Sequence, residues 1–105
     1  MNYQKLINSN IKELRQINNM TQEEFAEIIG ISIQGLSNIE RNRYQPTAET
    51  IDKICKSFNI LPAELLVVKE NTNEDLLINI NVLLKQCPPR KLKKVYEIIK
   101  ILIKN

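Results

Sequence analysis

Apolar residues recur along the chain at spacings of three and four, the period of an amphipathic α-helix, and no segment has the alternating pattern of a strand. The first such run covers residues 3–18, where Ile7, Ile11 and Leu14 share one face. Asn19 can end this helix in a left-handed conformation. The pattern therefore predicts an all-α chain that opens with a long helix.

A second helix is predicted from its capping residues. Thr21 and Glu24, three positions apart, form the pattern of a capping box, in which each side chain binds the backbone amide of the other end. Met20 before the cap and Phe25 after it match a hydrophobic staple. We expect this helix to begin sharply at Gln22.

The third helix follows after a very short turn. Gly30 is suited to ending the second helix, and Ser32 supplies a new N-cap for a helix over residues 33–41. Leu36 and Ile39, three positions apart, face inward. Two short helices joined by a three-residue turn form a helix-turn-helix, whose second helix can lie in the DNA major groove.

Two further helices complete the first part of the chain. Residues 42–46 form a polar break, Thr47 caps a fourth helix, and Asn59 is placed to end it. Pro62 suits the first position of a fifth helix of one to two turns, although the preceding residue offers no side-chain cap. The apolar face of the fourth helix consists of Ile51, Ile54, Cys55 and Phe58.

A polar stretch at residues 69–73 marks a domain boundary, so we expect one domain over residues 1–68 and a helical hairpin over residues 72–105. The hairpin helices meet at Pro88 and Pro89. Two helices alone make a thin core, which favours packing between subunits and hence a homodimer. The predicted dimerisation residues are Leu76, Ile80, Leu83, Leu84, Val95, Tyr96, Ile99 and Leu102.

Composition excludes most catalytic and cofactor chemistry. The 105 residues contain no histidine, which removes imidazole catalysis and mixed Cys/His zinc sites. Only two glycines are present, too few for a phosphate-binding loop. We therefore expect no enzyme, no cofactor and no metal.

The cysteines and the hydropathy pattern indicate a cytoplasmic protein. Cys55 and Cys87 lack metal-ligand spacing and lie beside apolar residues, so we expect both to be reduced and mostly buried. No apolar run approaches the ~18 residues of a membrane helix, and no secretory signal begins the chain. We expect no membrane association.

The net charge of +3 is unevenly distributed. Residues 1–70 carry 8 Lys and Arg against 9 Asp and Glu, whereas residues 71–105 carry 7 against 3. A basic run, Arg90, Lys91, Lys93 and Lys94, opens the last predicted helix, where it opposes the helix dipole. Such a run favours a bound anion, but a solvated face is the commoner reading of a charge run.

With these elements in place, residues 7–66, centred on TQEEFAEIIGISIQGLSNIERNRYQPTAETIDKICKSFNILPAELL, resemble the lambda-repressor-like (xenobiotic-response-element, Cro/CI-type) helix-turn-helix family. The resemblance implies a five-helix DNA-binding domain that acts on double-stranded DNA as a dimer, usually to repress transcription. It also implies a structural ion pair between Arg15 and Glu40, which join the first helix to the end of the recognition helix.

By position, the resemblance also assigns DNA contacts. Base reading falls to Ile33, Gln34, Ser37 and Asn38, and phosphate contact to Thr21, Gln22, Ser32, Arg41, Asn42 and Arg43. Gln and Asn can each bind an adenine edge through a donor and an acceptor, and Arg pairs with phosphate by charge and geometry.

Two positions depart from the family pattern. Ile33 stands where a polar reader is common, and Gly35 weakens an exposed helix by roughly 0.5–1 kcal/mol relative to alanine. We interpret Ile33 as a contact to a thymine methyl and Gly35 as a point where the backbone approaches DNA, which predicts an A/T-leaning half-site.

Two other readings remain open. The motif at residues 21–41 can be a packing unit that never meets DNA, which the net charge of −1 over residues 1–70 keeps in view. The C-terminal helices can instead hold a protein partner such as a toxin or an antirepressor, with DNA binding secondary.

Overall fold

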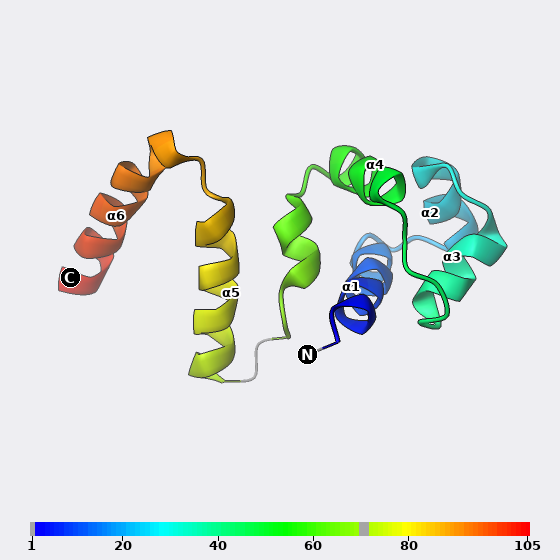
Figure 1. Cartoon of the computed structure of the whole chain (residues 1–105), viewed down its shortest axis with the longest axis horizontal. Helices are drawn as coiled ribbons and strands as arrows, with labels where there is room; N and C mark the ends of the chain where they lie inside the picture. The colour runs from blue at the N-terminus through cyan, green and yellow to red at the C-terminus, as the bar shows by residue number, and fades with distance from the viewer. Residues whose placement is uncertain (1, 70–71) are drawn as a thin grey trace. The chain divides into compact units, whose positions relative to one another are not determined.

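In a computed structural model, which describes residues 2–69 and 72–105, the chain is helical and forms two compact units, Met1–Val68 and Lys69–Asn105 (Figure 1). The prediction of an all-α fold is confirmed, since no strand occurs in the described ranges. The helices are α1 (Tyr3–Ile17), α2 (Gln22–Ile29), α3 (Ile33–Glu40), α4 (Ala48–Phe58), the 3-10 helix η1 (Pro62–Leu66), α5 (Asn73–Gln86) and α6 (Pro89–Lys104).

The N-caps expected from the sequence start α2, α3 and α4. The hydroxyls of Thr21, Ser32 and Thr47 each accept a hydrogen bond from the backbone amide three residues on, at 3.1, 2.9 and 3.1 Å. The Glu24 carboxylate accepts a hydrogen bond from the Thr21 amide, which completes the capping box. Asn2 caps α1 in the same way, a cap that was not expected from the sequence pattern.

Left-handed residues end the helices where expected. Asn19, Gly30 and Asn59 have φ of +55°, +73° and +53°. Arg41, expected inside the third helix, is instead its C-cap, so α3 is one residue shorter than predicted. The expected fifth helix is a 3-10 helix, since a segment this short lacks room for α-helical hydrogen bonds along its length.

The core of Met1–Val68 lies where these helices cross. Helix α1 packs against α3 and η1, α2 against α3 and α4, and α4 against η1. The rings of Phe25 and Phe58 stack with centroids 5.1 Å apart, which ties α2 to α4. The buried cluster consists of Ile11, Phe25, Ala26, Ile29, Leu36, Ile39, Ile54, Cys55 and Leu65.

The unit Lys69–Asn105 has no comparable core. No residue of α6 is buried, and Asn79 is the buried residue of α5. The two helices join at residues 87–88 and diverge without extended packing along their lengths (Figure 1). Cys87 at this junction is half-buried, so only Cys55 of the two free thiols is as buried as expected.

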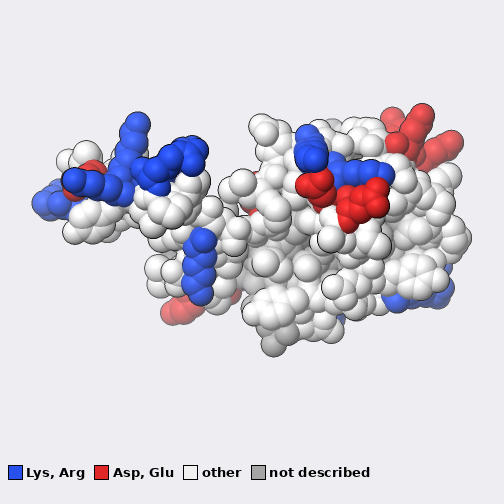
Figure 2. Space-filling model, turned by 45° about the horizontal axis from the view of Figure 1, so that its top comes forward, with Lys and Arg blue, Asp and Glu red and all other residues white. Residues whose placement is uncertain are grey.

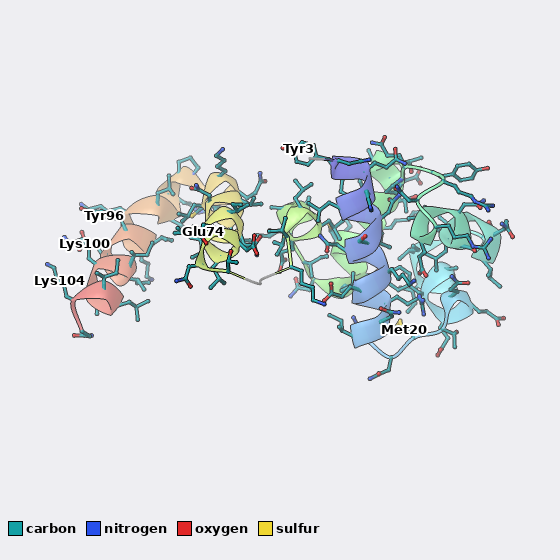
Figure 3. All side chains as sticks on the ribbon, turned by 90° about the horizontal axis from the view of Figure 1, so that it is seen from below. Tyr3, Met20, Glu74, Tyr96, Lys100 and Lys104 are labelled. Atoms are coloured by element: carbon teal, nitrogen blue, oxygen red, sulfur yellow. The ribbon has the colours of Figure 1, made fainter. Side chains whose placement is uncertain are left out.

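Large apolar side chains therefore face solvent on both C-terminal helices. Tyr96, Lys100 and Lys104 follow one side of α6, and the Lys100 ammonium lies 5.1 Å from the Tyr96 ring centroid (Figure 3). No helix in the described ranges is both long and apolar enough to span a membrane. The exposed apolar residues are Leu76, Leu77, Ile78, Ile80, Leu83, Leu92, Tyr96, Ile98, Ile101, Leu102 and Ile103.

Candidate nucleic-acid interface

The turn between α2 and α3 fixes the angle at which α3 leaves the core. Gly30 adopts a left-handed φ of +73°, and the Ile31 amide donates to the Ala26 carbonyl at 3.0 Å, which closes the end of α2. Ile31 packs against the buried cluster. Ser32 then caps α3, so hydrogen bonds hold the turn at both of its ends.

Helix α3 has a buried side and an exposed side. Leu36 and Ile39 are in the core, as expected, at 0% and 6% exposure. Ile33 is 48% exposed and Gln34 is exposed beside it, and Ser37 is half-buried. The first turn of α3 therefore presents an apolar and an amide side chain to a ligand.

Asn38 occupies a more enclosed position than the other predicted base readers. It is 9% exposed, and its Oδ1 accepts a hydrogen bond from Gln34 Nε2 at 3.4 Å. The two side chains are thus neighbours one turn apart. Gln34 offers the accessible amide of this pair.

The structure shows what a side chain at position 35, which is glycine in this chain, would contact. A Cβ at this position would lie 3.1 Å from the Ser32 hydroxyl oxygen that caps α3. A larger residue would require the Ser32 hydroxyl to shift by a few tenths of an ångström, which opposes its gain in helix propensity.

Glu40, at the end of α3, connects three parts of the fold. Its Oε2 lies 2.7 Å from Arg15 Nε and its Oε1 lies 3.0 Å from Arg15 Nη2, a bidentate ion pair between α1 and α3. The pair is enclosed, with side-chain exposures of 14% for Arg15 and 3% for Glu40. The hydrogen bond from Arg15 to Glu40 raises the pKa of the Arg15 guanidinium.

The same carboxylate binds the predicted phosphate-contacting glutamine. Gln22 Nε2 donates to Glu40 Oε1 at 3.1 Å, which holds the half-buried Gln22 side chain at the start of α2. An amide has two N–H groups, so one remains for a ligand while the other binds Glu40. Roles for both residues were expected from the sequence, but this bond between them was not.

Beyond α3, Arg41, Asn42 and Arg43 are all exposed, so the loop places two cations after this helix. Asn42 has a φ of +61°. The amides of Arg43 and Tyr44 both donate to the Asn38 carbonyl, at 2.8 and 3.4 Å. These bonds turn the chain back on the end of α3.

The hydroxyls of Thr21 and Ser32 accept hydrogen bonds as helix caps, and each keeps its O–H group as a donor for an anion. The N-termini of α2 and α3 also attract anions, because their first backbone amides lack intrahelical acceptors and the positive end of the helix dipole lies there. Glu23 and Glu24 lie in the first turn of α2, with Glu27 next on that helix, so their carboxylates offset the positive end of its dipole.

Basic side chains are concentrated on the last helix of the C-terminal unit. Figure 2 shows Lys and Arg over much of the visible surface of α6, with few acidic groups among them. In the described ranges, no group of three or more His, Cys, Asp or Glu residues is arranged to hold a metal.

Residues 11–65 match a family model described as helix-turn-helix. Antitoxin PezA of Streptococcus pneumoniae is 38% identical over 74 residues, covering 70% of this chain but only 43% of that protein. An uncharacterized HTH-type transcriptional regulator, y4dJ of Sinorhizobium fredii, is 35% identical over 69% of this chain and 94% of its own length.

Control protein C.SmaI of Serratia marcescens is 30% identical, with 70% of this chain and 88% of that protein aligned. This chain thus spans less than half of the pneumococcal antitoxin but most of the other two relatives. No solved structure gives a significant match.

Proposed function

The chain belongs to the XRE-type (Cro/CI-like) helix-turn-helix family, and we propose that it is a sequence-specific DNA-binding regulator of transcription that inserts α3 into the major groove. One observation carries this proposal most directly. The exposed first turn of α3, with Ile33 and Gln34, projects from a turn and a cap that fix its direction.

Phosphate contacts around α3 position it on the duplex. Arg41 and Arg43 face solvent in the loop that follows α3, and Gln22 is fixed at the N-terminus of α2 by Glu40. Contacts of this kind set register and orientation without reading sequence. Because the cations near α3 are few, the affinity depends only modestly on salt.

Base reading is assigned to Ile33, Gln34, Ser37 and Asn38. The exposed Gln34 amide can bind an adenine edge, and Ile33 can contact a thymine methyl, which together select an A/T-leaning half-site. Asn38 supports this by holding Gln34 through their 3.4 Å hydrogen bond. A selection that enriches only G/C half-sites contradicts this assignment.

The active species in this proposal is a homodimeric repressor. Residues 1–68 bind a half-site, and residues 72–105 join two chains. The exposed apolar faces of α5 and α6, which do not cover one another, support this role. Closing both faces against a second copy removes apolar surface from water and sets the half-site spacing.

A second candidate function is an antitoxin-like interaction protein, whose C-terminal helices hold a different protein. The similarity to antitoxin PezA favours it, although less than half of that protein is aligned. The oligomeric state discriminates the two. A stable homodimer supports the first proposal, whereas a monomer that becomes stable only with a second protein supports the other.

The direct test is selection from a random duplex library with purified protein at about 0.15 M salt, alongside a Gln34→Ala/Asn38→Ala variant. We expect two inverted half-sites roughly 34 Å apart, weakened or relaxed in the variant. Failure of a folded protein to enrich any sequence contradicts sequence-specific binding.

A further inference from the structure

Asn8, on α1, is buried at 1% exposure although it is polar. Its Nδ2 group donates to the Asn42 side-chain oxygen at 3.0 Å and to the Tyr44 carbonyl at 2.9 Å. Gln4, one turn earlier on α1, also reaches Asn42 Oδ1, at 3.5 Å. Helix α1 therefore contacts the loop after α3 at the Asn42 side chain and at the Tyr44 backbone carbonyl.

The amide of Asn8 is held in one orientation by these acceptors, because a backbone carbonyl accepts only from the nitrogen end. Its own Oδ1 is buried and has no hydrogen-bond partner within the described residues. A buried polar atom without a partner is costly, so an apolar side chain here would avoid a penalty. What the amide contributes is the connection to the loop.

That loop carries the two cations of the interface. Asn42 lies between Arg41 and Arg43 and has a φ of +61°, in the left-handed region that asparagine enters more readily than most other non-glycine residues. Fixing its side chain also fixes the backbone on either side. Both arginines are thus next in sequence to a residue that α1 contacts.

We propose that Asn8 is a positioning residue for DNA binding, which holds Asn42 in its left-handed conformation so that Arg41 and Arg43 face successive phosphates. The proposal rests on the proposed DNA-binding function. Asn8 touches no DNA in this scheme. Its effect reaches the phosphates only through the loop.

The chain offers a matched control on the same helix. Asn10 Nδ2 donates to the carbonyls of Leu65 and Val67, at 2.7 and 2.8 Å. Asn8→Ala and Asn10→Ala each remove two hydrogen bonds from one amide on α1. Both variants should therefore lose stability, and a loss of stability alone does not distinguish them. Only Asn8→Ala removes hydrogen bonds to the loop that contains Arg41 and Arg43.

The first measurement is binding to a mixed-sequence DNA duplex as a function of salt. For Asn8→Ala we expect roughly tenfold weaker binding for each arginine that no longer meets a phosphate. We also expect the plot of log affinity against log salt to be shallower by about 0.9 for each phosphate left without its arginine. Asn10→Ala retains the wild-type salt slope. Equal slopes for all three proteins overturn the proposal.

Asn42→Gly provides a second variant that keeps the left-handed backbone accessible but lacks the acceptor for Asn8. Asn8→Ala and Asn42→Gly both break the hydrogen bond between Asn8 and Asn42. The affinity of the double variant for DNA should therefore be close to that of the weaker-binding single variant. Fully additive decreases in affinity show that Asn8 acts by another route.

Trypsin tests the loop contact without DNA, since it cleaves after Arg41 and Arg43. We expect faster cleavage at these sites in Asn8→Ala than in Asn10→Ala under native conditions. If wild-type protein binds no duplex, the proposed function fails, and the cleavage rates still decide whether Asn8 holds the loop. Equal rates in both variants overturn that role of Asn8.

Discussion

Gln22 is bound to Glu40 by a 3.1 Å hydrogen bond. The side chain predicted to contact phosphate is therefore held by the carboxylate of the last residue of α3. Arg15 neutralises that carboxylate from α1. The ion pair therefore helps to hold Gln22 and also links α1 to α3. Its removal affects folding and the position of Gln22 together.

Glu40→Gln is expected to destabilise the fold by about 3–5 kcal/mol, because the enclosed Arg15 guanidinium loses its charged partner. Urea denaturation of the two proteins measures the difference. Glu49→Gln is the control, since the Glu49–Lys53 pair is 79% and 46% exposed and should contribute about 1 kcal/mol or less. An unchanged unfolding midpoint for Glu40→Gln contradicts a structural role for the pair.

Gln22→Ala should weaken binding to every duplex by a similar factor, roughly tenfold or more, because it removes one hydrogen bond from a neutral amide to a charged phosphate. The salt slope should stay constant, since no cation is removed. Fluorescence anisotropy with cognate and mixed-sequence duplexes distinguishes this from a base contact. Gln16→Ala, exposed on α1, should leave affinity unchanged. A decrease confined to the cognate duplex would assign Gln22 to base reading.

The pKa of Glu24 is lowered by the hydrogen bond from the Thr21 amide, followed by the bond with the Thr21 side chain. A lowered folded pKa stabilises the protein above the ordinary value of 4.5, and this contribution is lost as pH falls below it. The stability advantage of wild type over Glu24→Gln should therefore shrink on acidification. Thermal melting from pH 7 to pH 3 measures it.

Glu23→Gln, in the same first turn, serves as the comparison for this pH dependence because Glu23 is not the N3 residue of the capping box. Thermal melting of Glu23→Gln over the same pH range is the matched measurement. If both substitutions alter the pH profile equally, the effect belongs to the helix dipole and the capping box is not its source.

Burial raises the pKa of the Cys55 thiol, with smaller contributions from Asp52 and Glu64. A raised folded pKa favours the neutral thiol, so this stabilisation is complete below the ordinary value and is lost as pH rises above it. At pH 7 Cys55 should react slowly with iodoacetamide until the protein unfolds. Peptide mapping, with half-buried Cys87 as the internal comparison, measures both rates. Faster native alkylation of Cys55 contradicts its burial.

Leu83→Lys and Leu102→Lys should convert a dimer to a monomer, because each places a charge on an apolar face that the proposal buries between chains. Sedimentation velocity detects the change. Ile17→Lys is the control, since Ile17 is 68% exposed at the end of α1. A chain truncated after residue 70 should also be monomeric, and a truncated chain that remains a stable dimer refutes dimerisation through α5 and α6.

Local patterns determined most of the first unit. Thr21, Ser32 and Thr47 each bind an amide three residues away, and Gly30 ends α2 by its own conformational freedom, so these boundaries depend on short-range chemistry. The spacing of Leu36 and Ile39 likewise placed the inner face of α3. Such features are readable because the interacting groups lie within one or two helical turns.

Only the tertiary structure decided how distant groups share partners. Glu40 binds Arg15 and Gln22 from two other helices, and Asn8 binds Asn42 across 34 positions of sequence. An asparagine beside the apolar stripe of α1 was the available signal for the latter, but its spacing names no partner. Long-range hydrogen bonds depend on how helices cross, and helix periodicity carries no information about crossing.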